Sequence, residues 1–182
     1  REPMANYIAA EARCADMIIT GISPTDFYEG PTGVTAGEIV MQSGRPVLAV
    51  PVVTERFMLD TILVGWKDSR EARRAVADAL PILRLAKQVN LVEIVAEADL
   101  EKADKRLCDV VNWLRRHDIA ADYSVTTSVE DDSAQFISIA KQQKANLVVA
   151  GAYGHSRLHE WALGGVTNEL LQRAEFCCLL SH

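Results

Sequence analysis

Apolar runs and amphipathic segments alternate regularly from residue 61 to the end of the chain. The apolar runs are short and rich in Val, Ile and Leu, which is typical of strands that are buried on both faces. The segments between them repeat apolar residues every three or four positions, the period of a helix that lies on a sheet. Strands that alternate with helices in this way predict a parallel sheet with helices on both faces. The expected strands are residues 61–65, 89–95, 123–127, 147–150 and 177–181.

The N-terminal stretch repeats the pattern of the C-terminal one. We therefore predict that residues 1–51 are the last part of a first, incomplete domain, residues 52–60 a linker, and residues 61–182 a complete second domain. The alternative is a chance similarity between two strand–loop–strand segments. The paired segments are 15–21 with 145–151, 33–35 with 165–167, and 47–50 with 178–181.

Composition and charge exclude several classes of partner. The chain has 49% apolar and 24% charged residues, as expected for a globular protein. Its net charge of −6, with no basic stripe, argues against a nucleic-acid partner. No apolar run is long enough to span a bilayer and no signal sequence opens the chain, so we expect no membrane partner. The four cysteines lack the spacing of metal ligands, which favours a reducing, cytoplasmic environment.

A glycine-rich loop follows the expected strand 147–150. Gly151, Gly154 and Gly164 give it the spacing Gly-x2-Gly-x9-Gly, and a helix is predicted to start directly after it. Such a loop exposes backbone N–H groups at the positive end of a helix dipole, which favours a bound phosphate group. The alternative is a long loop that needs glycines only at its corners. Residues 66–69 also follow a strand, so both loops lie at carboxyl ends, where open parallel sheets bind ligands.

Three stretches of the chain together resemble the universal stress protein family: the glycine loop, residues 65–72 (GWKDSREA) and residues 44–51 (GRPVLAVP). The resemblance implies an α/β fold, a three-layer sandwich around a five-stranded parallel sheet of strand order 3-2-1-4-5. This fold is Rossmann-like and similar to that of the adenine nucleotide alpha hydrolases. The resemblance also implies self-association through the last strands. Either the strand from Pro46 to Val50 pairs with the strand from Cys177 to Ser181, or two chains form a homodimer.

Some members of this family bind ATP, and the resemblance assigns residues to that role. It places the ribose near Gly151 and Gly154, and the triphosphate near residues 164–167. ATP, with Mg²⁺ as its counter-ion, is the cofactor that it implies. The implied nucleotide-binding residues are Gly65, Trp66, Lys67, Asp68, Val92, Gly151, Gly154, Arg157, Gly164, Gly165, Val166 and Thr167.

Two of these residues depart from the family's pattern. Gly165 stands where the family has Ser or Thr, which removes a hydroxyl donor worth roughly 0.5–1.5 kcal/mol but leaves the backbone N–H groups. Lys67 stands where the family has an acidic residue that contacts the nucleoside, and Asp68 follows one position later. Lys67 either contacts phosphate or marks a site that no longer holds adenine. In the N-terminal copy Pro24 replaces the second glycine and Asp26 would repel phosphate, so we expect no nucleotide there.

Other candidate chemistry in the loop is weaker. His155 and His159 have the spacing of metal ligands on a helix, but no third ligand follows at a recognisable interval, so we expect no metal site. Ser156 lacks the Gly-x-Ser-x-Gly elbow of a nucleophile. Arg157 is either a phosphate contact or a surface charge, and Trp66 and Trp161 either stack a base or belong to the core. We predict no catalytic residues.

The sequence therefore predicts a cytoplasmic stress-response protein that binds a nucleotide, ATP first, at the glycine loop of the second domain. It would act through conformation or partner binding. The alternative is a dimeric interaction module whose cleft no longer binds a nucleotide, which Lys67 and Gly165 favour. Slow ATP hydrolysis is a third hypothesis, for which no general base is evident near the loop.

Overall fold

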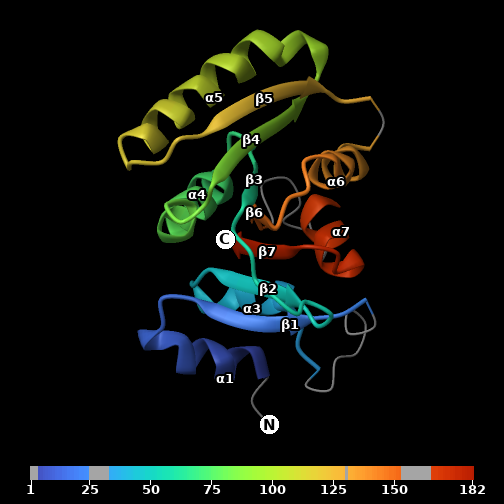
Figure 1. The fold of residues 1–182 in the computed structure, drawn as a ribbon. Coiled ribbons are helices and arrows are strands. Elements are labelled where there is room, and N and C mark those ends of the chain that lie inside the picture. The colour runs from blue at the N-terminus through green and yellow to red at the C-terminus, as the bar shows by residue number, and fades with distance from the viewer. Residues whose placement is uncertain (1–3, 25–32, 130, 153–164) are drawn as a thin grey trace.

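One seven-stranded sheet runs through the chain in the computed structural model, which describes residues 4–24, 33–129, 131–152 and 165–182 (Figure 1). The strand order is β1-β2-β7-β6-β3-β4-β5. Neighbouring strands are parallel, except that β2 and β7 are antiparallel. The strands are β1 (Ile18–Ile22), β2 (Val47–Pro51), β3 (Thr61–Gly65), β4 (Gln88–Val95), β5 (Asp122–Thr127), β6 (Leu147–Gly151) and β7 (Cys177–Ser181).

The predicted five-stranded, all-parallel sheet is wrong in strand number and in the order across the whole sheet. Strands β3 to β7 lie in the order β5-β4-β3-β6-β7, and β2 and β1 extend the sheet beyond β7. The register places Leu48 opposite Leu179 and Ala49 opposite Cys178. Without β2, one side of β7 would be an open edge with unpaired backbone groups, which β2 satisfies. The segments named in the predicted self-association thus lie side by side within one chain.

Helices cover both faces of the sheet and give it three layers (Figure 1). One face carries α4 (Arg70–Leu83) and α5 (Leu100–Arg115), and the other carries α3 (Ala36–Ser43), α6 (Asp132–Gln142) and α7 (Gly165–Arg173). Helix α1 (Met4–Glu11) packs on α3. The α/β sandwich predicted from the alternating pattern is confirmed. Two short 3₁₀ helices, Ala12–Cys14 and Glu97–Asp99, complete the described elements. None of the helices in the described part of the chain is both long and apolar enough to cross a membrane.

Helix α4 shows how the local sequence produces these layers. The hydroxyl of Ser69 accepts a hydrogen bond from the backbone N–H of Ala72 at 3.2 Å, which caps the first turn. The helix continues through Pro81 and ends at Leu83. Its apolar stripe is buried against β6 and β7, as the helical spacing predicted. The stripe consists of Ala72, Ala75, Val76, Ala79 and Leu83.

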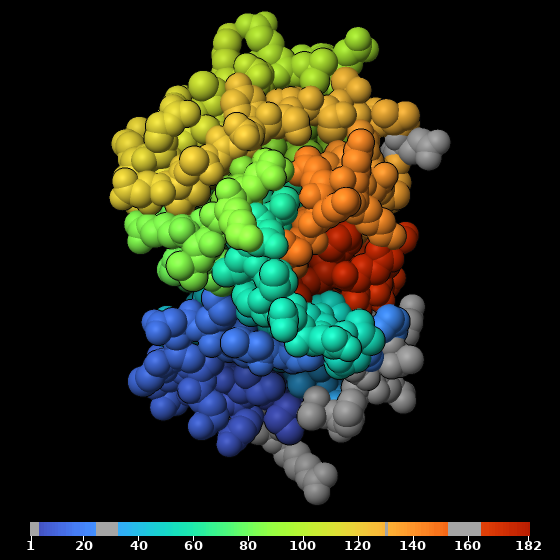
Figure 2. Space-filling model, in the orientation of Figure 1, coloured from blue at the N-terminus to red at the C-terminus, as the bar shows by residue number. Residues whose placement is uncertain are grey.

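The N-terminal segment packs directly against the rest of the chain (Figure 2). Among the described elements, its unit β1–α3–β2 has the same strand–helix–strand order as β6–α7–β7, the unit with which the sequence aligns it. The helix starts differ, because Thr35 is the N-cap that precedes α3, whereas Thr167 lies inside the first turn of α7. The division into domains at residues 1–51, 52–60 and 61–182 stays a prediction.

Candidate functional site

The carboxyl ends of β3 and β6 lie side by side in the middle of the sheet (Figure 1). Gly65 ends β3 opposite Ala150, and Gly151 ends β6 one residue later. From β3 the chain moves to β4 on one side, and from β6 it moves to β7 on the other. The strand order therefore reverses between β3 and β6, and α/β proteins commonly bind ligands in a crevice at the carboxyl ends of the strands where such a reversal occurs.

Gly151 is required where β6 meets the start of α4. A Cβ atom at this position would lie 2.6 Å from the backbone nitrogen of Ala72 and 2.6 Å from the carbonyl carbon of Glu71. Both neighbours are backbone atoms of a helix and cannot rotate away. The glycine therefore brings the start of the loop into direct contact with the first turn of α4.

Two helix N-termini meet near the start of that loop. Helix α7 begins at Gly165, and a Cβ atom there would lie 3.7 Å from the hydroxyl of Ser133 in the first turn of α6. That hydroxyl donates to the carboxylate of Asp131 at 2.5 Å, and the N–H of Ala134 donates to the same carboxylate at 3.2 Å. These hydrogen bonds lower the pKa of Asp131 below its ordinary value. The region is a cluster of N–H donors that already holds one carboxylate.

Thr167 ties α7 to β6. Its hydroxyl donates to the carbonyl of Gly151 at 3.4 Å, and the residue is only 3% exposed. Its neighbour Val166 is half-buried and packs against the hydrophobic cluster under α6 and α7. The structure thus places the predicted phosphate-binding residues Gly165, Val166 and Thr167 at the helix start, but the Thr167 hydroxyl is already engaged.

The loop after β3 has one buried and two exposed residues. The backbone N–H of Trp66 donates to the carbonyl of Val92 at 2.8 Å, and both side chains are buried. Lys67 is exposed, and among the described residues no acidic side chain forms an ion pair with it. Asp68 is exposed and pairs with Arg73 at 2.6 Å. Of this group, Lys67 is the side chain that is presented to solvent with its charge uncompensated.

Several predicted residues of the loop lie outside the described residues. They include three members of the predicted nucleotide site, Gly154, Arg157 and Gly164. The other candidates in this class are His155, Ser156, His159 and Trp161. Among the residues that the structure does describe, no group of three or more His, Cys, Asp or Glu side chains is placed to hold a metal ion.

Glu71 is a buried carboxylate at the site that the sequence did not reveal. It is 1% exposed, one oxygen is bound by Arg70, and Oε2 has no hydrogen-bond partner among the described residues. Burial raises its pKa, but hydrogen bonds from Arg70, its own backbone and Ser69 outweigh burial and leave the pKa below its ordinary value. An acidic residue in the first turn of a helix is normally a solvated helix-dipole partner, so only its contact with Gly151 identifies it.

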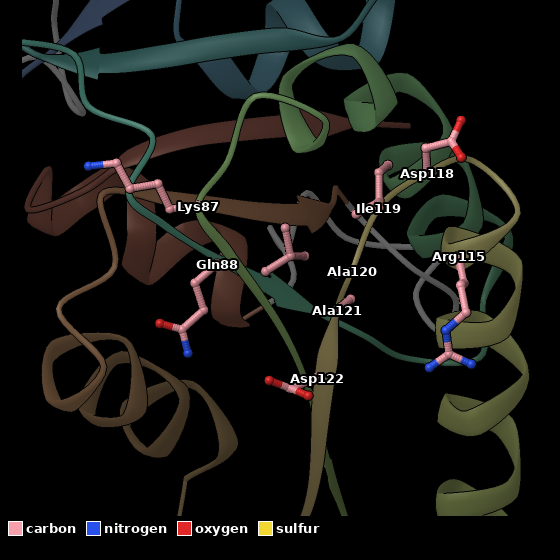
Figure 3. A pocket seen from close by; sticks show the side chains of 9 residues that line it. Lys87, Gln88, Arg115, Asp118, Ile119, Ala120, Ala121 and Asp122 are labelled. Atoms are coloured by element: carbon pink, nitrogen blue, oxygen red, sulfur yellow. The ribbon is translucent and has the colours of Figure 1, made fainter.

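A hollow lies at the opposite end of the strands, away from Gly65 and Gly151 (Figure 3). Its volume is about 580 Å³, and residues Lys87 to Val89 and Arg115 line it together with the turn from Asp118 to Asp122. It sits where β4 and β5 begin. Because ligands of parallel α/β sheets bind at the carboxyl ends, this hollow does not compete with the crevice between β3 and β6.

Comparison with known proteins connects this arrangement to one family. A model of the universal stress protein family matches residues 58–182. A search of curated proteins finds no match.

Solved structures with the same fold carry the same family description. A universal stress protein from Archaeoglobus fulgidus DSM 4304 is similar at a TM-score of 0.73 and 16% identity, over 97% of this chain and 64% of that one. UspA from Lactobacillus plantarum is similar at a TM-score of 0.58 and 19% identity, over 71% of this chain and 100% of that one. A protein of the universal stress protein family from Burkholderia pseudomallei is similar at a TM-score of 0.56 and 20% identity, over 67% of this chain and 95% of that one. This chain thus spans less than two thirds of the Archaeoglobus structure, and at these identities the likeness establishes the fold alone.

Proposed function

The chain belongs to the universal stress protein family, and from this premise we propose that it binds a nucleotide, ATP first, in the crevice between β3 and β6. Membership of the family supports a role in the response to stress. In the proposed function the bound nucleotide changes the conformation of the chain or its binding to a partner, without catalytic turnover, and the protein works in the cytoplasm.

The observation that carries the proposal is the reversal of strand order beside the first residue of α7. The reversal lies at the carboxyl ends of two adjacent strands, and Thr167, in the first turn of a nine-residue helix, is hydrogen-bonded to Gly151 there. The N–H groups of the first turn and the helix dipole favour the phosphates of a nucleotide. Gly165 and Val166 would supply these N–H groups.

Two further side chains fit a nucleotide at this place. Lys67 is exposed beside the crevice and would neutralise phosphate charge without first breaking an ion pair with a described residue. The buried Oε2 of Glu71 lacks a hydrogen-bond donor among the described residues, and the backbone of Glu71 lies next to Gly151, where the resemblance puts the ribose. A ribose hydroxyl would supply the missing donor.

A second candidate function is an interaction module that binds no nucleotide. It is favoured by the Thr167 hydroxyl, which is bonded to Gly151, and by the Asp131 carboxylate near the start of α7. The carboxylate already places negative charge at the N-terminus of α6, beside the start of α7 where the phosphates would bind. At the start of α3 a carboxylate likewise occupies the place of a phosphate, because Glu38 accepts hydrogen bonds from both the N–H and the hydroxyl of Thr35. We propose that α3 binds no nucleotide.

We further propose that self-association through the last strands takes place within the chain. Strand β7 has β6 on one side and β2 on the other, so a homodimer built through β7 would have to displace β2. The expected species in solution is therefore a monomer. Light scattering behind size-exclusion chromatography measures this mass directly, and a stable dimer would favour the homodimeric form of the interaction.

Calorimetric titration of the purified chain with ATP and Mg²⁺ tests the proposed function. We expect saturable binding and about tenfold weaker binding for Lys67→Glu, which corresponds to roughly 1.4 kcal/mol. The matched control is Lys87→Glu, because Lys87 is an exposed lysine just before β4, at the far end of the strands, and its surface pair with Asp60 contributes little. The control should bind as the parent does.

The two candidate functions give opposite results. If the parent chain shows no binding heat, and mass spectrometry of the denatured protein releases no nucleotide, the crevice is vestigial and the interaction module remains. Phosphate release above background in the purified sample would instead establish slow ATP hydrolysis.

A further inference from the structure

Strand β1 is the last strand of the sheet, and its outer edge pairs with no other described strand (Figure 1). Its inner edge pairs with β2, where the N–H of Ile18 donates to the carbonyl of Pro46 at 3.0 Å. Because backbone groups alternate along a strand, those of Ile19 and Gly21 point to the open side. The strand contains no charged residue, and an apolar edge of this kind is a template for pairing with another chain.

One face of β1 is exposed as well. On the other face, Ile18 and Ile22 pack into the hydrophobic cluster that includes residues of α1 and α3. Ile19 lies opposite Leu48, which belongs to the cluster under α4 and α5. Ile19 is nevertheless 69% exposed, whereas Val149, its counterpart in the internal repeat, is fully buried under α4 and α5. Among the described helices, none therefore covers this face of β1 as α4 covers β6.

Gly21 lies on this exposed face, and the described part of the chain does not require a glycine there. Its φ is not positive, and a Cβ atom would meet only a side-chain carbon of Val52 at 3.5 Å, an ordinary contact. A glycine inside a strand weakens the strand and often marks the close approach of another backbone. At Gly151, its counterpart in the repeat, that backbone is the first turn of α4, 2.6 Å from a Cβ atom. Gly21 thus leaves the space that a helix start needs, and no described helix fills it.

The other copy of the repeat shows what kind of segment fits this surface. The edge of β6 pairs in parallel with β3, and the face of β6 is covered by α4, which follows β3 after a short loop. The helix presents small residues to the sheet, among them Ala72, Ala75 and Ala79. The matching occupant of β1 is therefore a parallel strand followed directly by an amphipathic helix. A second copy of the chain cannot supply this unit while it stays folded, because its own β3 and α4 already contact β6.

We propose that the open edge and exposed face of β1 bind a strand–helix segment of a partner protein, in the way that β6 binds β3 and α4. The partner's strand pairs in parallel with the backbone of Ile19 and Gly21, which is a known mode of peptide recognition by sheet edges. The partner's helix begins against Gly21 and covers Ile19. This surface belongs to the N-terminal strands, so it does not depend on whether the crevice between β3 and β6 binds a nucleotide.

A synthetic peptide of residues 59–84 is the probe for this surface, because it contains β3, the loop after it and α4. The matched control is the same peptide with Leu63→Pro, because proline cannot donate to the hydrogen bonds between strands. NMR of the ¹⁵N-labelled chain measures binding from signal shifts and follows hydrogen exchange of the backbone amides. We expect saturable binding of the first peptide and at least tenfold slower exchange at Ile19 and Gly21. The proline peptide should leave both exchange rates unchanged.

Two variants of the chain provide the second test. Gly21→Ala should leave the midpoint of thermal unfolding unchanged but weaken binding of the peptide at least tenfold, because the new Cβ occupies the space of the helix start. Ile19→Lys should weaken binding at least fivefold, whereas Val129→Lys, at a position that is 77% exposed, should bind as the parent does.

Three results would overturn the proposal. They are a peptide that does not slow exchange in β1, a proline peptide that binds equally well, and a Gly21→Ala chain that binds the peptide as the parent does. A dimer of the chain alone, measured by light scattering and lost in Ile19→Lys, would also overturn it, because the occupant of β1 would then be a second copy.

Discussion

Replacing Gly151 by alanine should destabilise the fold, although it adds only a methyl group. The new Cβ would lie 2.6 Å from two backbone atoms of α4, the nitrogen of Ala72 and the carbonyl carbon of Glu71. It would also lie 2.9 Å from the Cβ of Glu71. Because the strand and the helix are both rigid, the end of β6 must move away from α4.

The expected loss in the free energy of unfolding follows from the contact between β6 and α4 that this movement would break. Overpacking a well-packed contact costs about 1–3 kcal/mol, and here the contact is with backbone, so we expect about 3 kcal/mol. A chain of this length loses about 2–4 °C in Tm per kcal/mol, so the Tm should fall by roughly 6–12 °C. Movement of β6 would also disturb the hydrogen bond from the Thr167 hydroxyl to the Gly151 carbonyl.

The matched control is Gly21→Ala, at the position that the internal repeat aligns with Gly151. Gly21 also lies in a strand, β1, but a Cβ there would meet only a side-chain carbon of Val52 at 3.5 Å, an ordinary contact. We expect this variant to stay within about 0.5 kcal/mol of the parent. Urea unfolding, followed by far-UV circular dichroism, measures both free energies of unfolding.

Equal stability of the two variants would refute the reasoning, because it would mean that β6 and α4 do not meet as closely as Gly151 requires. A change in the urea m-value would indicate a different unfolding transition, and the comparison would then use the midpoints of thermal unfolding. If the reasoning holds, Gly151→Ala should also weaken any nucleotide that binds next to it, whereas Gly21→Ala should not.

Three further variants test other features of the fold by urea unfolding. Glu93→Gln weakens the pair between the buried Glu93 carboxylate and Arg106 and should cost about 1–3 kcal/mol, whereas Glu101→Gln, in an exposed pair with Lys105, should cost no more than about 0.5 kcal/mol; similar losses would contradict the burial argument. Thr35→Ala removes the capping box of α3 and should cost about 1 kcal/mol, so an unchanged midpoint would show that the cap contributes nothing. Because the pKa of Glu71 in the folded state is lowered from 4.5, its carboxylate stabilises the fold above the unfolded pKa and loses this effect as the pH falls through the folded pKa. Glu71→Gln should therefore make the free energy of unfolding less dependent on pH below about pH 5. An unchanged pH dependence in this range would contradict the argument.

The helical faces and the central strands were predictable because their signals are local. The stripe of α4 and the apolar runs of β3 and β6 are buried as their periodicity predicted. The seven-stranded sheet was not predictable from periodicity, because the antiparallel pairing of β2 with β7 joins segments about 130 residues apart. Pairing over such a distance depends on edge backbone groups that any strand carries, so side-chain periodicity does not encode it, and only the family resemblance indicated that these two strands pair.

The close backbone approach at Gly151 was predictable from the sequence, and the buried charges were not. Gly151 follows from the need for close backbone approach, and the structure places it against α4. Glu71 and Glu93 occur in segments whose charged residues normally face solvent, and they are buried only because Arg70 and Arg106 bind them. A sequence pattern records that a residue is charged, but its partner becomes apparent only in three dimensions.

The start of the glycine loop is joined by backbone hydrogen bonds to the strand that pairs with the N-terminal segment. The N–H of Ala152 donates to the carbonyl of Ser181 at 2.7 Å, and the ring of His182 lies 3.0 Å from the carbonyl of Ala152. Ser181 ends β7, whose other edge binds β2. A ligand that shifted the backbone at Gly151 would therefore act first on β7 and then on β2, because rigid paired strands move together. If the proposed nucleotide acts through conformation, the sheet itself provides the connection, since β3, β6 and the N-terminal strands belong to one sheet.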